Sequence, residues 1–165
     1  MKQIRKMKKI KLERYQTPDK KSIYVRELKY SFYYNGKTIL FDSKRDCESY
    51  IVNINDCLNV LYNELNIIYI KTFEIYRKYM FFYSSSMFHK FKIIDMKFDN
   101  TYKSIETTNA STFVFANAQM IINELIEVFY IFEKIELQKR TYDKNYEIRI
   151  YINRLLQLKE DFSNL

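Results

Sequence analysis

The scarcity of chain-breaking residues constrains this chain more than any other feature. Gly occurs once, at Gly36, and Pro occurs once, at Pro18, in 165 residues. Because these two residues most often interrupt regular structure, most of the backbone is free to run in long helices. Hydrophobic residues make up 47% of the sequence, which is enough to build one packed core and argues against a disordered chain.

The single glycine lies in the strongest local signal. Asn35-Gly36 separates two runs of aromatic and β-branched residues, a pattern typical of a β-hairpin closed by a type I′ turn. A two-residue turn there predicts an antiparallel register with the pairs Tyr34–Lys37, Phe32–Ile39 and Tyr30–Phe41. The register predicts a core face of Leu28, Tyr30, Phe32, Ile39 and Phe41, and a wet face of Lys29, Ser31, Tyr33, Thr38 and Asp42.

Apolar residues at three- and four-residue spacing predict helices after the hairpin. Ser43 is the expected N-cap of a helix of about 40 residues that reaches Phe82, and the serines at 84–86 should end or kink it. Residues 87–107 fit either a helix or a strand, and we favour the helix. Two further helices are expected, one from a cap at residues 109–111 to about Arg140 and one from about Asp143 to Phe162.

These patterns predict a mainly α protein with a small β part (α+β), in which an N-terminal β-hairpin packs on a bundle of three to four long helices. Residues 1–21 are expected to be a basic N-terminal arm. Residues 22–165 are expected to form a single domain, with the hairpin at 22–42 and the helical bundle at 43–165.

Charge is concentrated in the arm. The whole chain has a net charge of +8, and residues 1–21 hold nine cations against Glu13 and Asp19. The spacing of Ile4, Met7 and Ile10 leaves a short helix, an extended strand and disorder open for this arm. The core pattern starts at Ile23, so the body is expected to fold without residues 1–21.

A cationic arm of this kind creates a potential that attracts phosphate backbones, acidic membranes or acidic proteins. We favour a nucleic acid or a ribonucleoprotein as the partner over a purely solubilising role. Binding to a membrane surface is disfavoured because Trp is absent and the apolar stripe of the arm is short. The candidate nucleic-acid- or partner-binding residues are Lys2, Arg5, Lys6, Lys8, Lys9, Lys11, Arg14, Lys20 and Lys21.

The inventory of reactive residues argues against an enzyme. His89 is the single histidine, so it lacks a second histidine for zinc or a specific nucleophile partner. One glycine excludes a phosphate-cradling loop. Glu124, Glu127, Glu133 and Glu136 lack the histidines of a two-metal site, and their spacing suits a solvated helix face with Glu136 near Arg140. We therefore predict no catalytic residue, metal, cofactor or small-molecule substrate.

The cysteines and the apolar segments bear on location. Cys47 and Cys57 lie ten residues, or about 15 Å, apart on one predicted helix, too far for a disulfide. Two reduced core thiols indicate a cytoplasmic protein. The most apolar stretch, residues 113–132, contains Asn117, Asn123 and Glu124, which are costly in lipid. No membrane association is expected.

Two resemblances add expectations. The segment from Tyr24 to Ile51 resembles small sheet-and-helix DNA-binding modules of a plant type and of the phage integrase N-terminal type. That resemblance implies a three-stranded sheet in the major groove, with Arg26, Lys29 and Lys37 on its wet face. As a whole, the chain resembles small phage-encoded anti-CRISPR-type inhibitor proteins in size, AT-biased composition, lack of a catalytic set and aromatic content. This implies binding to a protein or ribonucleoprotein in the host cytoplasm rather than chemistry.

Three hypotheses follow. The first is a non-enzymatic binding protein that engages a nucleic acid or a ribonucleoprotein nuclease and inhibits or modulates it, with a small DNA-binding accessory protein as its alternative. The second is a helical-bundle scaffold that forms homo-oligomers through its long helix. The third, which we disfavour, is an enzyme with an unrecognised site.

Overall fold

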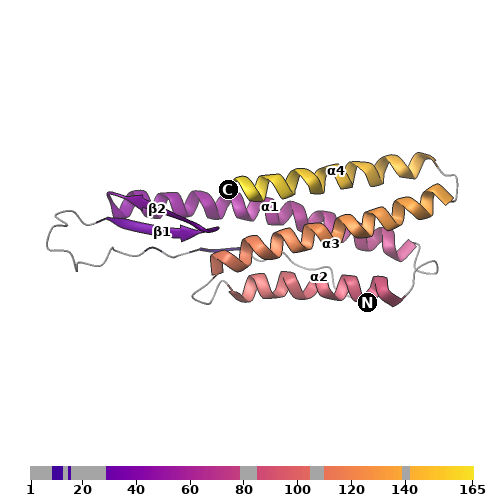
Figure 1. Ribbon diagram of the computed structural model, residues 1–165, viewed down its shortest axis with the longest axis horizontal. Helices are drawn as coiled ribbons and strands as arrows, with labels where there is room; N and C mark the ends of the chain where they lie inside the picture. Colours follow the sequence, from indigo (N-terminus) through magenta and orange to yellow (C-terminus); the bar gives the residue numbers. More distant parts are fainter. Residues whose placement is uncertain (1–8, 13–14, 16–28, 79–84, 105–109, 139–141) are drawn as a thin grey trace.

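A computed structural model describes residues 9–12, 15, 29–78, 85–104, 110–138 and 142–165. In these residues, a two-stranded hairpin precedes four helices (Figure 1). The strands are β1 (Tyr30–Tyr34) and β2 (Lys37–Phe41). The helices are α1 (Lys44–Lys78), α2 (Ser85–Ser104), α3 (Ala110–Gln138) and α4 (Tyr142–Asn164). The predicted fold class is confirmed.

The hairpin has the predicted register. Tyr34 pairs with Lys37, Phe32 with Ile39 and Tyr30 with Phe41. Asn35 and Gly36 have φ values of 47° and 72°, so both turn residues are left-handed, as a type I′ turn requires. Within the described residues the sheet has two strands, whereas the resemblance to DNA-binding modules implies three.

The faces of the hairpin are as predicted where they are described. Phe32 is buried against the helices, while Tyr33 on the opposite face is 52% exposed. Leu28 lies outside the described residues. Tyr34 is also buried, and its hydroxyl lies 2.6 Å from that of Tyr50 and donates to the Leu165 carbonyl at 2.8 Å. Burial first, and the hydrogen bond with Tyr50 second, raise the pKa of Tyr34.

The N-terminus of α1 carries the predicted cap. The Ser43 hydroxyl accepts a hydrogen bond from the Asp46 backbone N–H at 3.1 Å, and the Ser43 carbonyl accepts one from the Cys47 N–H at 3.2 Å. The first bond satisfies a backbone donor that the first helical turn leaves open, and the second is the first regular bond of the helix. Asp46 adds a negative charge near the positive helix end.

The remaining helices follow the sequence periodicity. Residues 87–104, which fitted either a helix or a strand, belong to α2. The change from α1 to α2 falls near the predicted serine run, since α1 is described to Lys78 and α2 begins at Ser85. The last two helices begin and end within two residues of the predicted positions.

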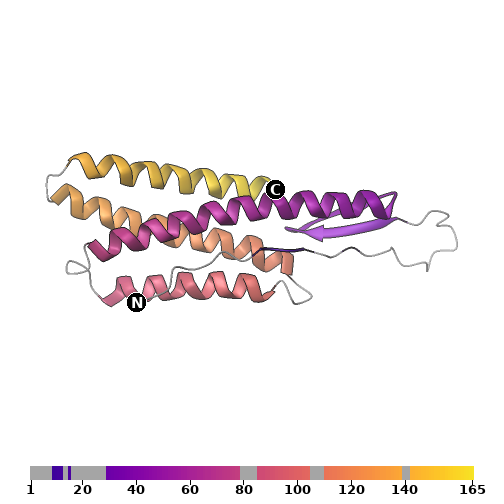
Figure 2. The same ribbon diagram turned by 180° about the vertical axis from the view of Figure 1, so that it is seen from behind.

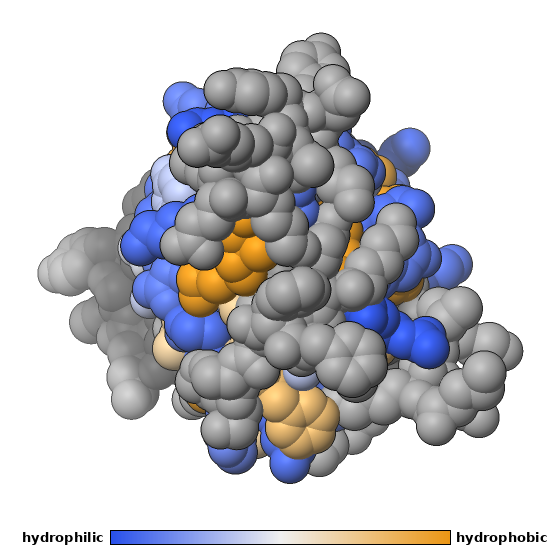
Figure 3. Space-filling view, turned by 90° about the vertical axis from the view of Figure 1, so that its right-hand side faces the viewer, coloured by the Kyte–Doolittle hydropathy of each residue, from blue (hydrophilic) through white to orange (hydrophobic). Residues whose placement is uncertain are grey.

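α3 is the central helix and packs between α2 and α4, while α1 crosses both α3 and α4 (Figure 1). The buried face of α3 contributes Phe129 and Phe132 to the core, and their rings meet edge to face with centres 5.7 Å apart. Tyr62 of α1 is fully buried and donates its hydroxyl hydrogen to the Val114 carbonyl of α3. The N-terminal part of α1 extends beyond the other helices, and the hairpin packs along it. At the opposite end, small apolar patches lie between hydrophilic side chains (Figure 3).

Candidate functional site

Residues 9–12 of the basic segment lie along α1, where two asparagine side chains bind their backbone. Asn59 accepts the Ile10 N–H on Oδ1 at 2.7 Å and donates from Nδ2 to the Ile10 carbonyl at 2.9 Å. Asn55 makes the same pair of bonds with Leu12, at 2.6 Å and 2.9 Å. Each side-chain amide therefore replaces the two hydrogen bonds that a neighbouring β-strand would make. We call residues 9–12 the strap.

The spacing of the two asparagines matches the repeat of an extended chain. Asn55 and Asn59 lie one helical turn apart, about 6 Å along the axis. Ile10 and Leu12 are two residues apart, which spans about 6.6 Å in an extended segment. The two repeats agree closely enough for both amides to bind alternate strap residues. Because Ile10 meets Asn59 and Leu12 meets Asn55, the strap runs antiparallel to α1.

Side chains of the strap alternate between the core and the surface. Ile10 and Leu12 are 1% and 3% exposed, while Lys9 and Lys11 are exposed. This two-residue period is that of an extended chain, so residues 9–12 do not form the helix that was one of the open alternatives. Ile10 and Leu12 belong to the core, and the expectation that the core begins at Ile23 was wrong.

Two of the nine predicted binding residues can be placed. Lys9 and Lys11 project from the same side of the strap, away from the core. The other seven lie outside the described residues: Lys2, Arg5, Lys6, Lys8, Arg14, Lys20 and Lys21. The sequence analysis identified the cations but missed Asn55 and Asn59, which bind the backbone of the strap. Their four-residue spacing beside the core stripe of α1 was the available signal.

A small polar cluster holds Tyr15, three residues beyond the strap. The Tyr15 hydroxyl donates to Glu48 Oε1 at 3.2 Å, and Lys44 Nζ lies 5.4 Å from the centre of the Tyr15 ring. The Tyr15 hydroxyl, followed by the Glu48 carboxylate, raises the pKa of Lys44. Lys44 and Glu48 also form an exposed ion pair at 3.7 Å, which contributes little to stability by itself. The cluster extends the contact between the N-terminal segment and α1.

The glutamates of α3 do not form the solvated face that their spacing suggested. Glu136 is 2% exposed and continues the buried stripe of Phe129 and Phe132, so its assignment to a solvated face was wrong. Glu124 and Glu127 both pair with Lys90 of α2, at 3.4 Å and 2.5 Å. Among the described residues, no group of three or more His, Cys, Asp or Glu side chains is arranged to hold a metal ion.

The histidine and the cysteines occupy different environments. His89 is exposed and meets the ring of Phe88 edge to face at 6.3 Å. Both cysteines are free, and Cys47 is buried as predicted, but Cys57 is exposed, so only one of them is a core thiol. Burial, with a smaller contribution from Glu48, raises the pKa of the Cys47 thiol. This shift makes Cys47 a poorer nucleophile.

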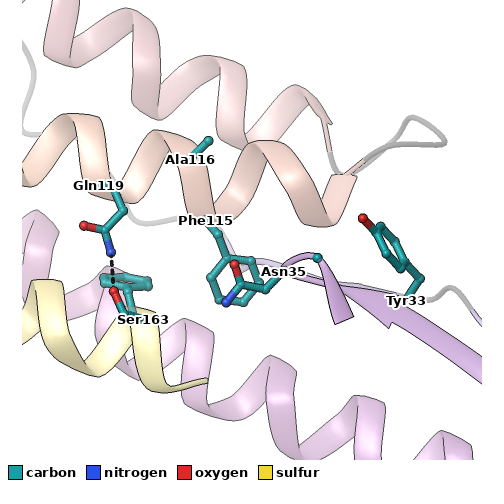
Figure 4. Close-up of a pocket in the computed structure, with 8 residues that line it drawn as sticks. Tyr33, Asn35, Phe115, Ala116, Gln119 and Ser163 are labelled. Carbon is teal, nitrogen blue, oxygen red and sulfur yellow. Dashed lines mark hydrogen bonds between the residues drawn. The ribbon is translucent and has the colours of Figure 1, made fainter. Parts of the chain in front are cut away.

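A surface pocket of about 410 Å³ lies where the hairpin turn approaches α3 and α4 (Figure 4). Asn35 and Tyr33 line it from the hairpin, and Phe115 and Gln119 from α3. The Gln119 amide is already held, because its Nε2 donates to Ser163 Oγ at 3.1 Å and to a carbonyl of α4. The residues that line this pocket are neutral, so it offers stacking and hydrogen bonds rather than acid–base chemistry.

One described helical segment, Val114–Glu136 in α3, is long and apolar enough to cross a membrane by length and composition. Half of its most apolar window is buried inside the bundle. The core helix of a helical bundle has this same character, because α3 packs against α2 on one side and α4 on the other.

Comparisons with known proteins found no matching family model, no similar curated protein and no similar solved structure.

Proposed function

We propose that this protein is a non-enzymatic binding protein whose basic N-terminal segment contacts the phosphate backbone of a nucleic acid. That nucleic acid is either free or part of a ribonucleoprotein nuclease, which the protein then inhibits or modulates. The observation that carries the proposal is the strap: Lys9 and Lys11 project outward from a backbone segment that Asn55 and Asn59 hold against α1.

A fixed backbone favours this role energetically. Cations on a free tail lose conformational freedom when they bind, whereas the main chain of the strap is already ordered by four hydrogen bonds. Two lysines on alternate residues lie about 6.6 Å apart along the strap, close to the phosphate spacing of a nucleic-acid strand. Phosphate contacts of this kind supply affinity without reading the sequence.

Exposed aromatic side chains support contact with bases as well as with phosphates. Tyr33 is 52% exposed beside the pocket at the hairpin turn, and neutral amide groups lie close by. Stacking of unpaired bases on an aromatic ring is favourable for every base. This pattern favours a single-stranded ligand or a ribonucleoprotein over the major-groove binding of the sheet-and-helix modules.

The direct test is the salt dependence of binding to a duplex and to a single strand, measured by fluorescence anisotropy. The double variant Lys9→Gln/Lys11→Gln removes two phosphate contacts, and the slope of log K against log salt should fall by about 2 on a duplex. Lys92→Gln/Lys134→Gln removes the same charge from exposed positions on α2 and α3 and should change the slope far less. Equal slopes for the two double variants would refute the role of the strap.

The modulator role is tested separately with guided nucleases. Cleavage by the nuclease should fall as the molar ratio of this protein to the nuclease approaches about one to one, because each molecule of a binding protein inhibits only the nuclease molecule to which it is bound. Inhibition at strongly substoichiometric amounts would indicate an enzyme. Binding to nucleic acid with no effect on any nuclease would refute the modulator role and support the alternative of a small DNA-binding accessory protein.

A further inference from the structure

Three large apolar side chains are exposed on the face of α1 that points away from the other described helices. In Figure 2, α1 lies nearest the viewer, and no other described helix lies in front of it. Val52, Val60 and Ile67 on this face are 56%, 65% and 50% exposed. The outer face, as we call it, comprises Arg45, Val52, Asp56, Val60, Asn63, Ile67 and Glu74, all of them exposed.

Residues of the outer face follow the spacing of a helix–helix seam. The central five recur at intervals of four, four, three and four residues, which keeps them on one side of a helix that packs along another helix. α1 thus carries an apolar stripe that is buried in its own bundle, and a second stripe in which apolar and polar residues alternate and which has no described partner. Isolated exposed apolar residues need no explanation, but a stripe in register along four turns does.

The outer face is also symmetric about its own midpoint, which lies between Asn59 and Val60. Arg45 lies as far before that point as Glu74 lies after it. Val52 and Ile67 are related in the same way, and so are Asp56 and Asn63. A helix with this pattern is complementary to itself when a second copy is turned end for end.

We propose that the outer face of α1 binds a second copy of this chain as an antiparallel, two-fold symmetric helix pair. Arg45 then lies opposite Glu74 of the partner subunit, and Val52 lies opposite Ile67 of the partner subunit. Val60 lies beside the two-fold axis and meets Val60 of the partner subunit. A parallel pair would instead place the Arg45 residues together and the Glu74 residues together, so charge selects the antiparallel arrangement.

A neighbouring pocket extends this apolar surface. It has a volume of about 440 Å³, and Asp56, Cys57, Val60 and Leu61 of α1 line it together with the end of α4. Val60 therefore belongs both to the outer face and to the lining of this pocket at the α1–α4 seam. A side chain from the second copy gains contacts in this hollow that a flat helix surface would not offer.

The pairing would place both straps on the same side of the dimer. A two-fold axis perpendicular to two antiparallel helices carries each flank of one helix onto the same flank of the other. Ile10 is bound to Asn59, next to the axis, so the exposed lysines of both straps would lie close together. The dimer itself does not depend on the proposed binding of nucleic acid, whereas this doubling of the cationic surface rests on it.

Sedimentation velocity over about 1 μM to about 100 μM tests the pairing, because weak association is visible in that range. The full chain should move from 20.4 kDa towards twice that mass as concentration rises. Val60→Glu places like charges at the axis and beside Asp56, and should weaken association at least about tenfold. Met96→Glu, at a position 61% exposed on α2, is the matched control and should associate as the unaltered chain does.

Charge reversal tests the antiparallel register. Arg45→Glu and Glu74→Arg should each weaken the dimer, and the two together should restore it, because the reversed pair has the same geometry. A monomer at every concentration would overturn the proposal, as would a dimer that Val60→Glu leaves intact. Failure of the double reversal to restore association would overturn the antiparallel arrangement. These outcomes are independent of the salt-slope experiment on the strap.

Discussion

The hairpin and the strap both lay an extended segment against α1, but they are specified in opposite ways. The hairpin is held by its own ladder, and its turn needs only two adjacent residues, Asn35 and Gly36. Within the described residues the strap is not a strand of the sheet, and the backbone groups of Ile10 and Leu12 bond to Asn59 and Asn55, more than forty residues away. One extended segment is encoded locally and the other by a distant pair of side chains.

This difference explains why one could be predicted and the other could not. A turn signal and the alternation around it fall within a short window of sequence, which fixes the register of β1 and β2. The strap shows only a four-residue alternation, Lys9 to Leu12, which is too short to distinguish from chance. Asparagine on a helix surface is common, so the four-residue spacing of Asn55 and Asn59 was too weak a signal to predict their role.

The largest effect should come from the core face of the hairpin. Replacing Phe32, which is 1% exposed, with Ala should lower the free energy of unfolding by about 3–5 kcal/mol, because it leaves a cavity among aromatic rings. Its sequence neighbour Tyr33 is 52% exposed, and Tyr33→Ala should change stability by no more than about 0.5 kcal/mol. Urea titration followed by circular dichroism measures both.

A similar loss for Phe32→Ala and Tyr33→Ala would contradict the assignment of one core face and one wet face. It would mean that both faces of the hairpin are covered, as they would be if another segment or another molecule packed on Tyr33.

The strap should respond next most strongly. Asn55→Ala/Asn59→Ala removes four hydrogen bonds from the backbone N–H and carbonyl groups of Ile10 and Leu12, and alanine offers nothing to replace them. Buried unpaired groups cost about 1–3 kcal/mol each, so the strap should detach rather than remain docked. The total loss is then limited to the docking free energy, which we expect to be about 2–4 kcal/mol from the apolar area of Ile10 and Leu12.

Detachment can be measured directly, because trypsin cleaves after lysine. Cleavage after Lys9 and Lys11, followed by mass spectrometry, should be much faster in the double variant than in the unaltered chain. Asn53→Ala is the control, since Asn53 is an exposed asparagine of α1 that lies outside the outer face. If the double variant protects Lys9 and Lys11 as well as the control does, the asparagines do not hold the strap.

Elsewhere, prediction from sequence succeeded where one periodicity dominated and failed where a residue type was judged apart from its position. Residues 87–104 were assigned correctly because their apolar spacing fitted a helix of sufficient length. Glu136 was misplaced because a glutamate was expected in solvent, although it continues the stripe of Leu125, Phe129 and Phe132. Cys57 was misplaced for the converse reason, since cysteine is usually buried but this position faces away from Leu58 and the core.

The smallest expected effect on stability comes from the turn residue Gly36. An added Cβ at Gly36 meets no atom within 4 Å, so a substitution there is opposed only by the backbone conformation, with φ at +72°. Gly36→Val should therefore cost about 1–3 kcal/mol, because β-branched residues avoid positive φ. Gly36→Asn should cost less than about 1 kcal/mol, because Asn tolerates this region. Both values come from thermal or urea unfolding, and the Val and Asn variants act as controls for each other. If the two variants were equally destabilised, contacts rather than φ would govern the turn. The hairpin would then not be specified by the backbone preference of its turn residues, and it would not differ from the strap in the way argued above.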